Sequence, residues 1–143
     1  MIDTEAFFEC LNLKHVELPD SLQIIKYGAF YGCKGLTGTL TIPPSVTAIG
    51  NNAFANCSGL TELTIPPSVK AIPSSAFNRC SSLKHVTFPD SLKNIEDGAF
   101  SGCQSLDQET VERLNAVNPD ACSQLWNDSG FFISKRPTST SGR

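Results

Sequence analysis

Apolar residues recur along most of the chain in one fixed order. An Ala-Phe pair is followed three residues after the Phe by a Cys, and three residues later by a Leu. The order occurs five times in register, with a period of 23 residues and one step of 24. The pairs are Ala6-Phe7, Ala29-Phe30, Ala53-Phe54, Ala76-Phe77 and Ala99-Phe100, with cysteines at Cys10, Cys33, Cys57, Cys80 and Cys103. A fixed period in this range is typical of solenoids.

Each unit predicts one short strand and one turn. In the third unit, Leu63 and Ile65 alternate with Glu62 and Thr64, which is the period of a strand with one buried face. A Pro follows every such strand and ends it, because Pro cannot donate to a β-ladder. A Ser two residues later is expected to hydrogen-bond the backbone of its own turn. These residues are Pro19, Pro43, Pro66 and Pro89, with Ser21, Ser45, Ser68 and Ser91.

The apolar positions of one unit come from every side of a coil, so a single unit cannot bury them. Stacked units can, because each coil covers the next. The third unit also contains an L-x-x-L-x-L pattern, formed by Leu60, Leu63 and Ile65. With A-F-x-x-C-x-x-L and I-P-x-S-V-x-x-I, this pattern resembles the BspA-like (Treponema-type) leucine-rich repeat family over roughly residues 2–106.

The resemblance implies a leucine-rich-repeat solenoid. Its right-handed coil would have short parallel β-strands on the concave face and irregular, 3-10 or short β segments on the convex side. Members of the family are commonly surface or secreted proteins of bacteria and protists that mediate attachment. The resemblance therefore implies adhesion or partner binding, although one fold hosts many functions.

The pattern divides the chain into residues 1–106, a solenoid of a partial first coil plus about four repeats; residues 107–133, a helical C-terminal cap; and residues 134–143, a flexible tail. Val111, Leu114 and Val117 predict a short amphipathic helix. Its start is either a capping box from Ser105 to Gln108 or an N-cap at Asp107.

Asn118-Pro119 predicts the start of a second helix. That helix would carry Ala121, Cys122, Leu125 and Trp126. A turn at residues 127–130 and a short strand at residues 131–133 would follow. The alternative to a cap is a bridge toward another domain.

The N-terminal end predicts an open edge. Ile2 stands four residues before Ala6, as equivalent isoleucines do in later units, so the chain begins within a coil. Either further coils precede Met1, or this uncapped edge pairs with another molecule, with self-association as one form of that pairing. The first residues lack the features of a signal peptide. The protein is therefore either cytoplasmic, or a piece of a longer precursor that is secreted or displayed at the cell surface.

Composition argues against two classes of partner. The net charge is −3, and the eleven basic residues never cluster beyond Lys135-Arg136. Nucleic-acid binding needs a basic stripe, and a polybasic membrane anchor needs a basic cluster. Membrane insertion is also not expected, because no apolar run reaches the length of a span.

The six cysteines predict packing instead of chemistry. No C-x-x-C motif occurs. Five cysteines share one position per coil and are expected to form a buried column whose parallel Cβ vectors disfavour disulfides. Cys122 falls out of phase and is expected to be more accessible.

No catalytic, cofactor or metal site is predicted. His15 and His85 share one position in units one and four, about 14 Å apart at strand spacing, so one ion cannot bind both. They are expected to be solvated surface residues. The sequence shows no nucleophile with a base, no paired carboxylates in a pocket and no phosphate loop, so an enzyme is not expected.

Two columns of short polar side chains are the candidate binding surface. One contains His15, Thr39, Glu62 and His85, and the other contains Glu17, Thr41, Thr64 and Thr87. Such a ladder suits recognition of a peptide or glycan by hydrogen bonds, although a solvated sheet face would look similar. The leading hypothesis is a protein- or glycan-binding module of a longer adhesin-like protein. The alternatives are a structural spacer, or the targeting arm of an enzyme whose catalytic domain lies outside this chain.

Overall fold

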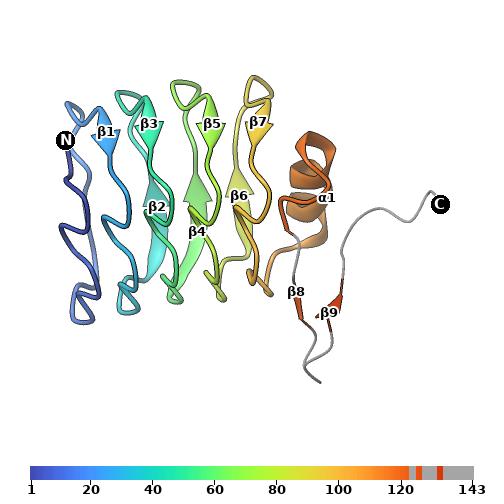
Figure 1. Cartoon of the computed structure of the whole chain (residues 1–143), viewed down its shortest axis with the longest axis horizontal. Coiled ribbons are helices and arrows are strands. Elements are labelled where there is room, and N and C mark those ends of the chain that lie inside the picture. Colours follow the sequence, from blue (N-terminus) through green and yellow to red (C-terminus); the bar gives the residue numbers. More distant parts are fainter. Residues whose placement is uncertain (123–124, 127–131, 134–143) are drawn as a thin grey trace, which may run out of the picture.

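The chain winds into a stack of coils that ends in a helix (Figure 1). The computed structural model describes residues 1–122, 125–126 and 132–133. One side of the stack carries a parallel sheet in the order β2-β4-β6, formed by Gly38–Thr41, Leu60–Thr64 and His85–Thr87. The predicted solenoid with short parallel strands is thus confirmed.

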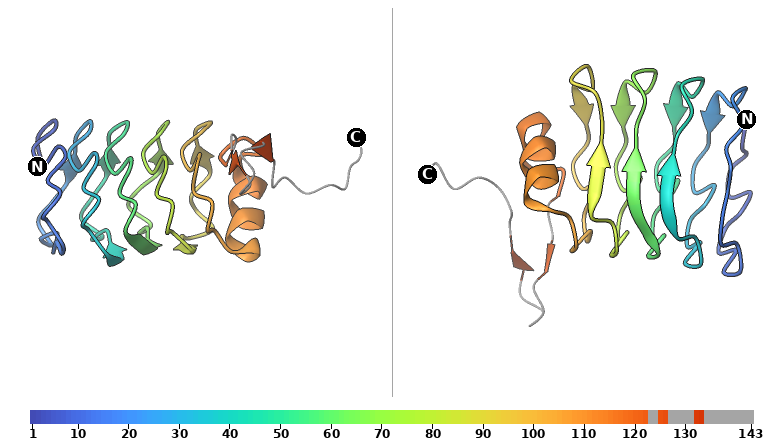
Figure 2. Two further views of the ribbon diagram at one scale, coloured as in Figure 1. Left: turned by 90° about the horizontal axis from the view of Figure 1, so that it is seen from below. Right: turned by 180° about the vertical axis from the view of Figure 1, so that it is seen from behind.

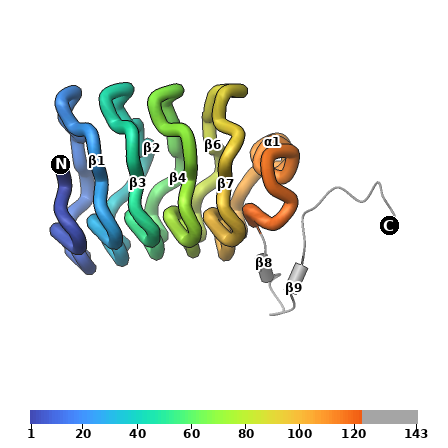
Figure 3. Tube along the Cα trace, turned by 45° about the horizontal axis from the view of Figure 1, so that its top comes forward, coloured from blue at the N-terminus to red at the C-terminus, as the bar shows by residue number. Residues whose placement is uncertain are grey.

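Shorter strands lie on the opposite side of the coils (Figure 2). β1 pairs with β3 and β5 pairs with β7, all in parallel. These strands are β1 Ile24–Ile25, β3 Ala48–Ile49, β5 Ala71–Ile72 and β7 Asn94–Ile95. The trace in Figure 3 shows successive coils following nearly the same path, which keeps equivalent residues in columns.

A column of stacked Phe rings fills the centre of the coils. Neighbouring rings are nearly parallel, with centroids between 5.0 and 5.4 Å apart. The rings are fully buried except at the N-terminal end, where Phe7 is 36% exposed. The column runs through Phe7, Phe30, Phe54, Phe77 and Phe100. Offset ring stacking adds to the energy of burial, so each coil is held to the next by the same contact.

The cysteine column lies beside the Phe column, as predicted. Each buried thiol donates a hydrogen bond to the backbone carbonyl oxygen of the Phe one coil earlier, over 3.0–3.2 Å. The donors are Cys33, Cys57, Cys80 and Cys103, whereas Cys10 is half-buried. All are free thiols. Burial raises the pKa of the Cys57 thiol well above its ordinary value.

Each coil turns through two residues in the left-handed backbone region, one just before the Ala and one just before the Cys. Gly fits such a position best and Asn tolerates it, whereas other side chains crowd the backbone there. The first column is Glu5, Gly28, Asn52, Ser75 and Gly98, and the second is Glu9, Gly32, Asn56, Arg79 and Gly102.

The one 24-residue step falls at a bulge in the pairing of β2 with β4. The register between β2 and β4 shifts at Gly38, which pairs with Leu60, whereas Thr39 pairs with Glu62. Gly38 has φ +79°. A Gly in this conformation is the usual way to insert one residue into a strand. The extra residue in the second unit is therefore Gly38.

Helix α1 (Gln108–Val117) covers the last coil. It begins at the N-cap Asp107, whose carboxylate accepts from the Thr110 backbone N–H. The hydroxyl of Thr110 accepts from the Val86 N–H at 3.3 Å, and Arg113 donates to the Phe88 carbonyl at 2.8 Å. Helix side chains thus bond the backbone at the edge of β6, where another strand would otherwise pair.

The predicted second helix is wrong. Asn118 caps the end of α1, with its N–H on the Leu114 carbonyl, and its side chain donates to the Ile95 carbonyl at 2.7 Å. The chain then returns to the path of a coil, because the Ala121 carbonyl accepts from the Phe100 N–H as an Ala of the next unit would. The pattern at Asn118-Pro119 marks the end of a helix and a turn.

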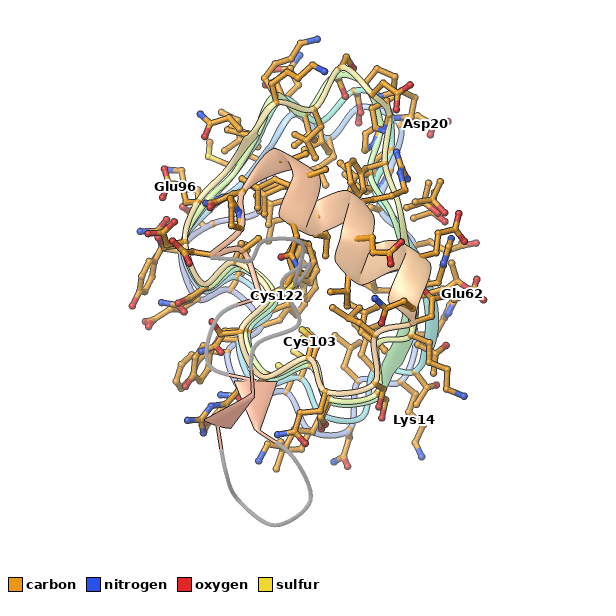
Figure 4. All side chains as sticks on the ribbon, turned by 90° about the vertical axis from the view of Figure 1, so that its right-hand side faces the viewer. Lys14, Asp20, Glu62, Glu96, Cys103 and Cys122 are labelled. Atoms are coloured by element: carbon orange, nitrogen blue, oxygen red, sulfur yellow. The ribbon has the colours of Figure 1, made fainter. Side chains whose placement is uncertain are left out.

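Cys122 is 3% exposed, so its predicted accessibility is also wrong. It follows Ala121 as Phe follows Ala in the coils, which places it inside the stack (Figure 4). Leu125–Trp126 is strand β8, not helix, and pairs antiparallel with β9 (Phe132–Ile133), which confirms part of the predicted final strand. The predicted turn at 127–130, residue 131 and the tail at 134–143 lie outside the described residues.

The turn serines behave differently from the prediction. In two turns the hydroxyls of Ser45 and Ser68 are buried with no hydrogen-bond partner among the described residues. The turns close through the backbone instead: the Val46 N–H donates to the Pro43 carbonyl at 3.0 Å, and the equivalent bond recurs in the other coils.

Candidate binding surface

The predicted polar columns stand in register on the sheet. Thr39 pairs with Glu62 and Glu62 with His85. Thr41, Thr64 and Thr87 form the second row. The residues between the two polar columns (Leu40, Leu63 and Val86) are buried, so the side chains of the columns point outward. Glu62 is seen on this outer side in Figure 4. We call the six residues Thr39, Thr41, Glu62, Thr64, His85 and Thr87 the strand face.

His15 and Glu17 are exposed but do not belong to the sheet. Residues 14–18 form no strand. The Thr37 N–H donates to the Lys14 carbonyl at 3.2 Å, and no other backbone hydrogen bond from the described residues reaches this segment. The extra residue of the second coil, Gly38, lies in the strand with which residues 14–18 would have to pair, and an inserted residue interrupts a regular ladder. The two predicted columns therefore begin with His15 and Glu17, which lie outside the sheet that carries the strand face.

A cavity of about 620 Å³ lies between the first two coils, where residues 15–20 face residues of the second coil. Four of the eight predicted residues line it: His15, Glu17, Thr39 and Thr41. The remaining lining is mostly apolar and consists of Val16, Leu18, Pro19, Pro43 and Pro44, with Asp20 at the top in Figure 4. Apolar walls with a few polar groups are typical of binding sites. We call this space the inter-coil cavity.

His85 differs from the solvated residue that was predicted. Its Nδ1 lies 3.0 Å from Asp107 Oδ2 and 3.1 Å from Thr110 Oγ1, so the ring joins β6 to the start of α1. Hydrogen bonds from Thr110, and then from His85, lower the pKa of Asp107. His85 thus serves the cap as well as the strand face. His15 is exposed, as expected.

The other seven predicted side chains make no hydrogen bond or ion pair within the part of the chain that the structure describes. Their polar groups are set on a ladder of coils and face water. A partner can therefore bond them by displacing the water that they bind.

No metal centre and no helix able to cross a membrane is found among residues 1–122, 125–126 and 132–133. No three His, Cys, Asp or Glu residues in these ranges are placed to hold an ion. α1 has 10 residues, and no helix in the ranges combines the length and apolar character that crossing a bilayer requires.

Sequence reasoning missed the inter-coil cavity. Its signal was the step of 24 residues between the second and third units, because an inserted residue must be absorbed somewhere in the coil. A Gly flanked by Thr37 and Thr39 in the strand segment was the place to expect it.

Comparisons with known proteins agree with this architecture. The family sequence model described as BspA type leucine-rich repeat region matches residues 1–124, in six copies. No curated protein matches the chain.

Three crystal structures resemble the chain. A leucine-rich repeat protein of T. pallidum has a TM-score of 0.74 and a sequence identity of 28%, and the match covers 80% of this chain and 53% of that protein's chain. A leucine-rich repeat protein from Bacteroides ovatus has a TM-score of 0.67 and an identity of 38%, and the match covers 72% of this chain and 26% of that chain. A leucine-rich cell surface protein from Faecalibacterium prausnitzii has a TM-score of 0.60 and an identity of 32%, and the match covers 73% of this chain and 34% of that chain.

The chain thus spans between about a quarter and about half of the length of these neighbours. Their repeats match the coils described above, and the family model covers most of the sequence. The chain belongs to the BspA-type leucine-rich repeat family.

Proposed function

We propose that the chain is a partner-binding module of a longer, cell-surface adhesin-like protein. Its partner binds in the inter-coil cavity and along the strand face. The module carries out no catalysis itself. The observation that carries the proposal is the cavity of about 620 Å³, which gathers four of the eight predicted residues and adds an apolar wall to them.

The chemistry of the cavity favours a protein partner. Leu18 and the prolines Pro19, Pro43 and Pro44 offer a surface for one apolar side chain. The polar groups of the cavity and strand face can bond the backbone of an extended peptide along the columns. A glycan would use the same hydroxyls but gain little from the prolines. The strand face lacks exposed aromatic and Arg anchors, so affinity is expected to depend on many contacts.

The surface location is supported by likeness. One structural neighbour is described as a cell surface protein, and the neighbours' chains are longer than this one. Display at a cell surface suits a short solenoid that presents one face of a rigid ladder.

An array of purified extracellular proteins and glycans tests the proposal. It is probed with the wild-type chain, with a double variant Thr41→Lys and Thr64→Lys, and with a control double variant Gln23→Lys and Asn94→Lys. Both variants add two charges at positions that are not buried, but the control places them at or beside β1 and β7, on the opposite side of the coils.

Binding to a protein that is lost in the first variant and kept in the control supports the proposal. Binding that both variants retain excludes the strand face. Absence of any binding by the wild-type chain favours the structural spacer, and binding that needs a linked catalytic domain favours the targeting arm.

A further inference from the structure

A second cavity, of about 410 Å³, lies on another part of the coils and shares no lining residue with the inter-coil cavity. It is lined by the turn segments of the first two coils, with one residue each from the next two. Its lining residues are Glu5, Phe8, Glu9, Tyr27, Gly28, Tyr31, Asn52 and Asn78. In Figure 4, Glu96 lies on the side of the coils opposite Glu62 of the strand face. Glu96 occupies in a later coil the place that Lys26, next to Tyr27 of the cavity, occupies in the second coil.

Three aromatic residues line this second cavity: Phe8, Tyr27 and Tyr31. Phe8 and Tyr31 stack outside the core, with centroids 5.1 Å apart and planes inclined by 10°. Phe8 is 45% exposed, and the neighbouring Tyr27 is 49% exposed. Later coils carry Ala55, Asn78 and Ser101 in the column of Phe8 and Tyr31. Among the described coils, an aromatic residue at this position therefore occurs in the first two and not in the later ones.

Two carboxylates flank the stacked rings. Glu5 and Glu9 both have left-handed backbones, with φ of 55° and 53°, at positions where the second coil has Gly. Each side chain lies over that Gly: a Cβ added at Gly28 would be 3.3 Å from Glu5 Cγ, and one at Gly32 would be 2.9 Å from Glu9 Cγ. A Glu is a costly residue in this conformation. Both Glu side chains are thus held against the second coil, and both line the cavity with Phe8.

The carboxylates have no positive partner within the described residues, where the ion pairs involve other side chains. Lys26 pairs with Asp3 at 3.5 Å, and the stem of Arg79 lies over Gly102, toward the C-terminal end of the stack. The amides Asn52 and Asn78 complete the cavity wall. The site is therefore acidic, aromatic and open.

We propose that this second cavity binds the positively charged side chain of an Arg in a basic peptide segment of a protein partner. A guanidinium stacks on the faces of exposed aromatic rings through cation–π attraction, and its N–H groups donate to carboxylates. The rings of Phe8, Tyr27 and Tyr31 supply the faces, and Glu5 and Glu9 supply the acceptors. This site is separate from the proposed strand-face site and does not depend on it.

The test uses the peptide acetyl-Gly-Arg-Gly-amide, and the same peptide with citrulline in place of Arg. Citrulline keeps the shape and planarity of Arg but removes its charge. Binding is followed by NMR through the aromatic signals of Phe8, Tyr27 and Tyr31. The protein forms are the wild type, the double variant Glu5→Gln and Glu9→Gln, the variant Tyr27→Ala, and the control Glu17→Gln on the inter-coil cavity.

We expect the Arg peptide to shift the three aromatic residues saturably and the citrulline peptide to bind at least tenfold more weakly. The double Gln variant should lose at least tenfold in affinity and Tyr27→Ala at least threefold, whereas Glu17→Gln should bind as the wild type does. Amide spectra establish that each variant is folded. If the double Gln variant is not folded, the affinity of the Tyr27→Ala variant for the Arg peptide tests the proposal.

Equal affinity for the two peptides would overturn the proposal, as would unchanged binding in the variants. The proposal would also be overturned if the Arg peptide shifted only the signals of Thr39 and Thr41. It would be overturned as well if a neutral disaccharide shifted the three aromatic residues of the cavity and the Arg peptide did not. None of these results bears on the strand face as a partner site, because its array test uses different variants.

Discussion

The thiol of Cys57 donates a hydrogen bond to the backbone carbonyl oxygen of Phe30, one coil earlier, at 3.2 Å. The same oxygen accepts the Cys33 N–H at 3.2 Å, so it closes the turn of its own coil and also joins the next coil. The Cys column therefore links coils through the backbone, and the Phe column links them through the rings.

Replacing Cys57 with Ala should lower the free energy of unfolding by about 1–2 kcal/mol, because it removes a buried sulfur and a bond between coils. The loss stays moderate since the Phe30 carbonyl keeps its bond from Cys33. Urea denaturation measures it. The matched control is Cys10→Ala in the half-buried first position, where the loss should be below about 0.5 kcal/mol. Equal losses at the two positions would contradict the bonded column.

The same thiol predicts how stability depends on alkaline pH. Burial raises the pKa of Cys57 well above the ordinary value of 9.0. The unfolded chain therefore releases this proton above about pH 9 while the folded chain keeps it, so stability falls as pH rises.

Above pH 9, the wild type should lose about 1.4 kcal/mol per pH unit more than Cys57→Ala does. Denaturation midpoints from pH 7 to 11, measured under reducing conditions, give the difference between the two curves. Parallel curves would mean that the thiol ionises as easily in the folded protein as in the unfolded chain.

The cap depends on one hydroxyl. Replacing Thr110 with Val keeps the shape but leaves the Val86 N–H without its acceptor and removes a bond to His85. An unpaired buried N–H costs about 1–3 kcal/mol, so Thr110→Val should be destabilised by that amount. The Val86 amide should also exchange faster. The control Thr87→Val changes an exposed Thr on the same strand and should cost within about 0.5 kcal/mol. A neutral Thr110→Val would show that α1 covers the coil without bonding it.

Much of this architecture followed from period and alternation. The Phe and Cys columns, and the pairing of Thr39 with Glu62 and of Thr41 with Thr64, are consequences of a repeat that places equivalent residues above one another. The start of α1 at Asp107 was one of two starts that the spacing allowed.

The errors arose where local and repeat signals conflict. Asn followed by Pro is typical of a helix start, but here the Asn118 side chain bonds the Ile95 carbonyl and the chain resumes a coil. In the structure Ala121 takes the place of the next Ala, but it comes 22 residues after Ala99 and is followed by Cys122 instead of Phe, so both the spacing and the residue type hide the match. The role of His85 in the cap could not be predicted either, since it requires knowing where α1 lies.

Deleting Gly38 should close the inter-coil cavity. The deletion restores the 23-residue period, so residues 14–18 can join the edge of β2 and their amides should become protected from exchange. The free energy of unfolding should stay equal or rise, while binding of an array partner is lost. The control Gly38→Asn keeps the bulge, because Asn tolerates positive φ and nothing lies within 4 Å of an added Cβ. Binding that survives the deletion would separate partner recognition from the cavity.

Hydrogen exchange of the chain with its strongest array partner locates the bound partner on the coils. We expect the partner to slow exchange in residues 15–20, in 39–44 and along β4 and β6. Exchange in β1, β3, β5 and β7 should stay unchanged. Slower exchange confined to those four strands, or to the turns that carry Tyr27 and Tyr31, would contradict the assignment of the partner site to the inter-coil cavity and strand face.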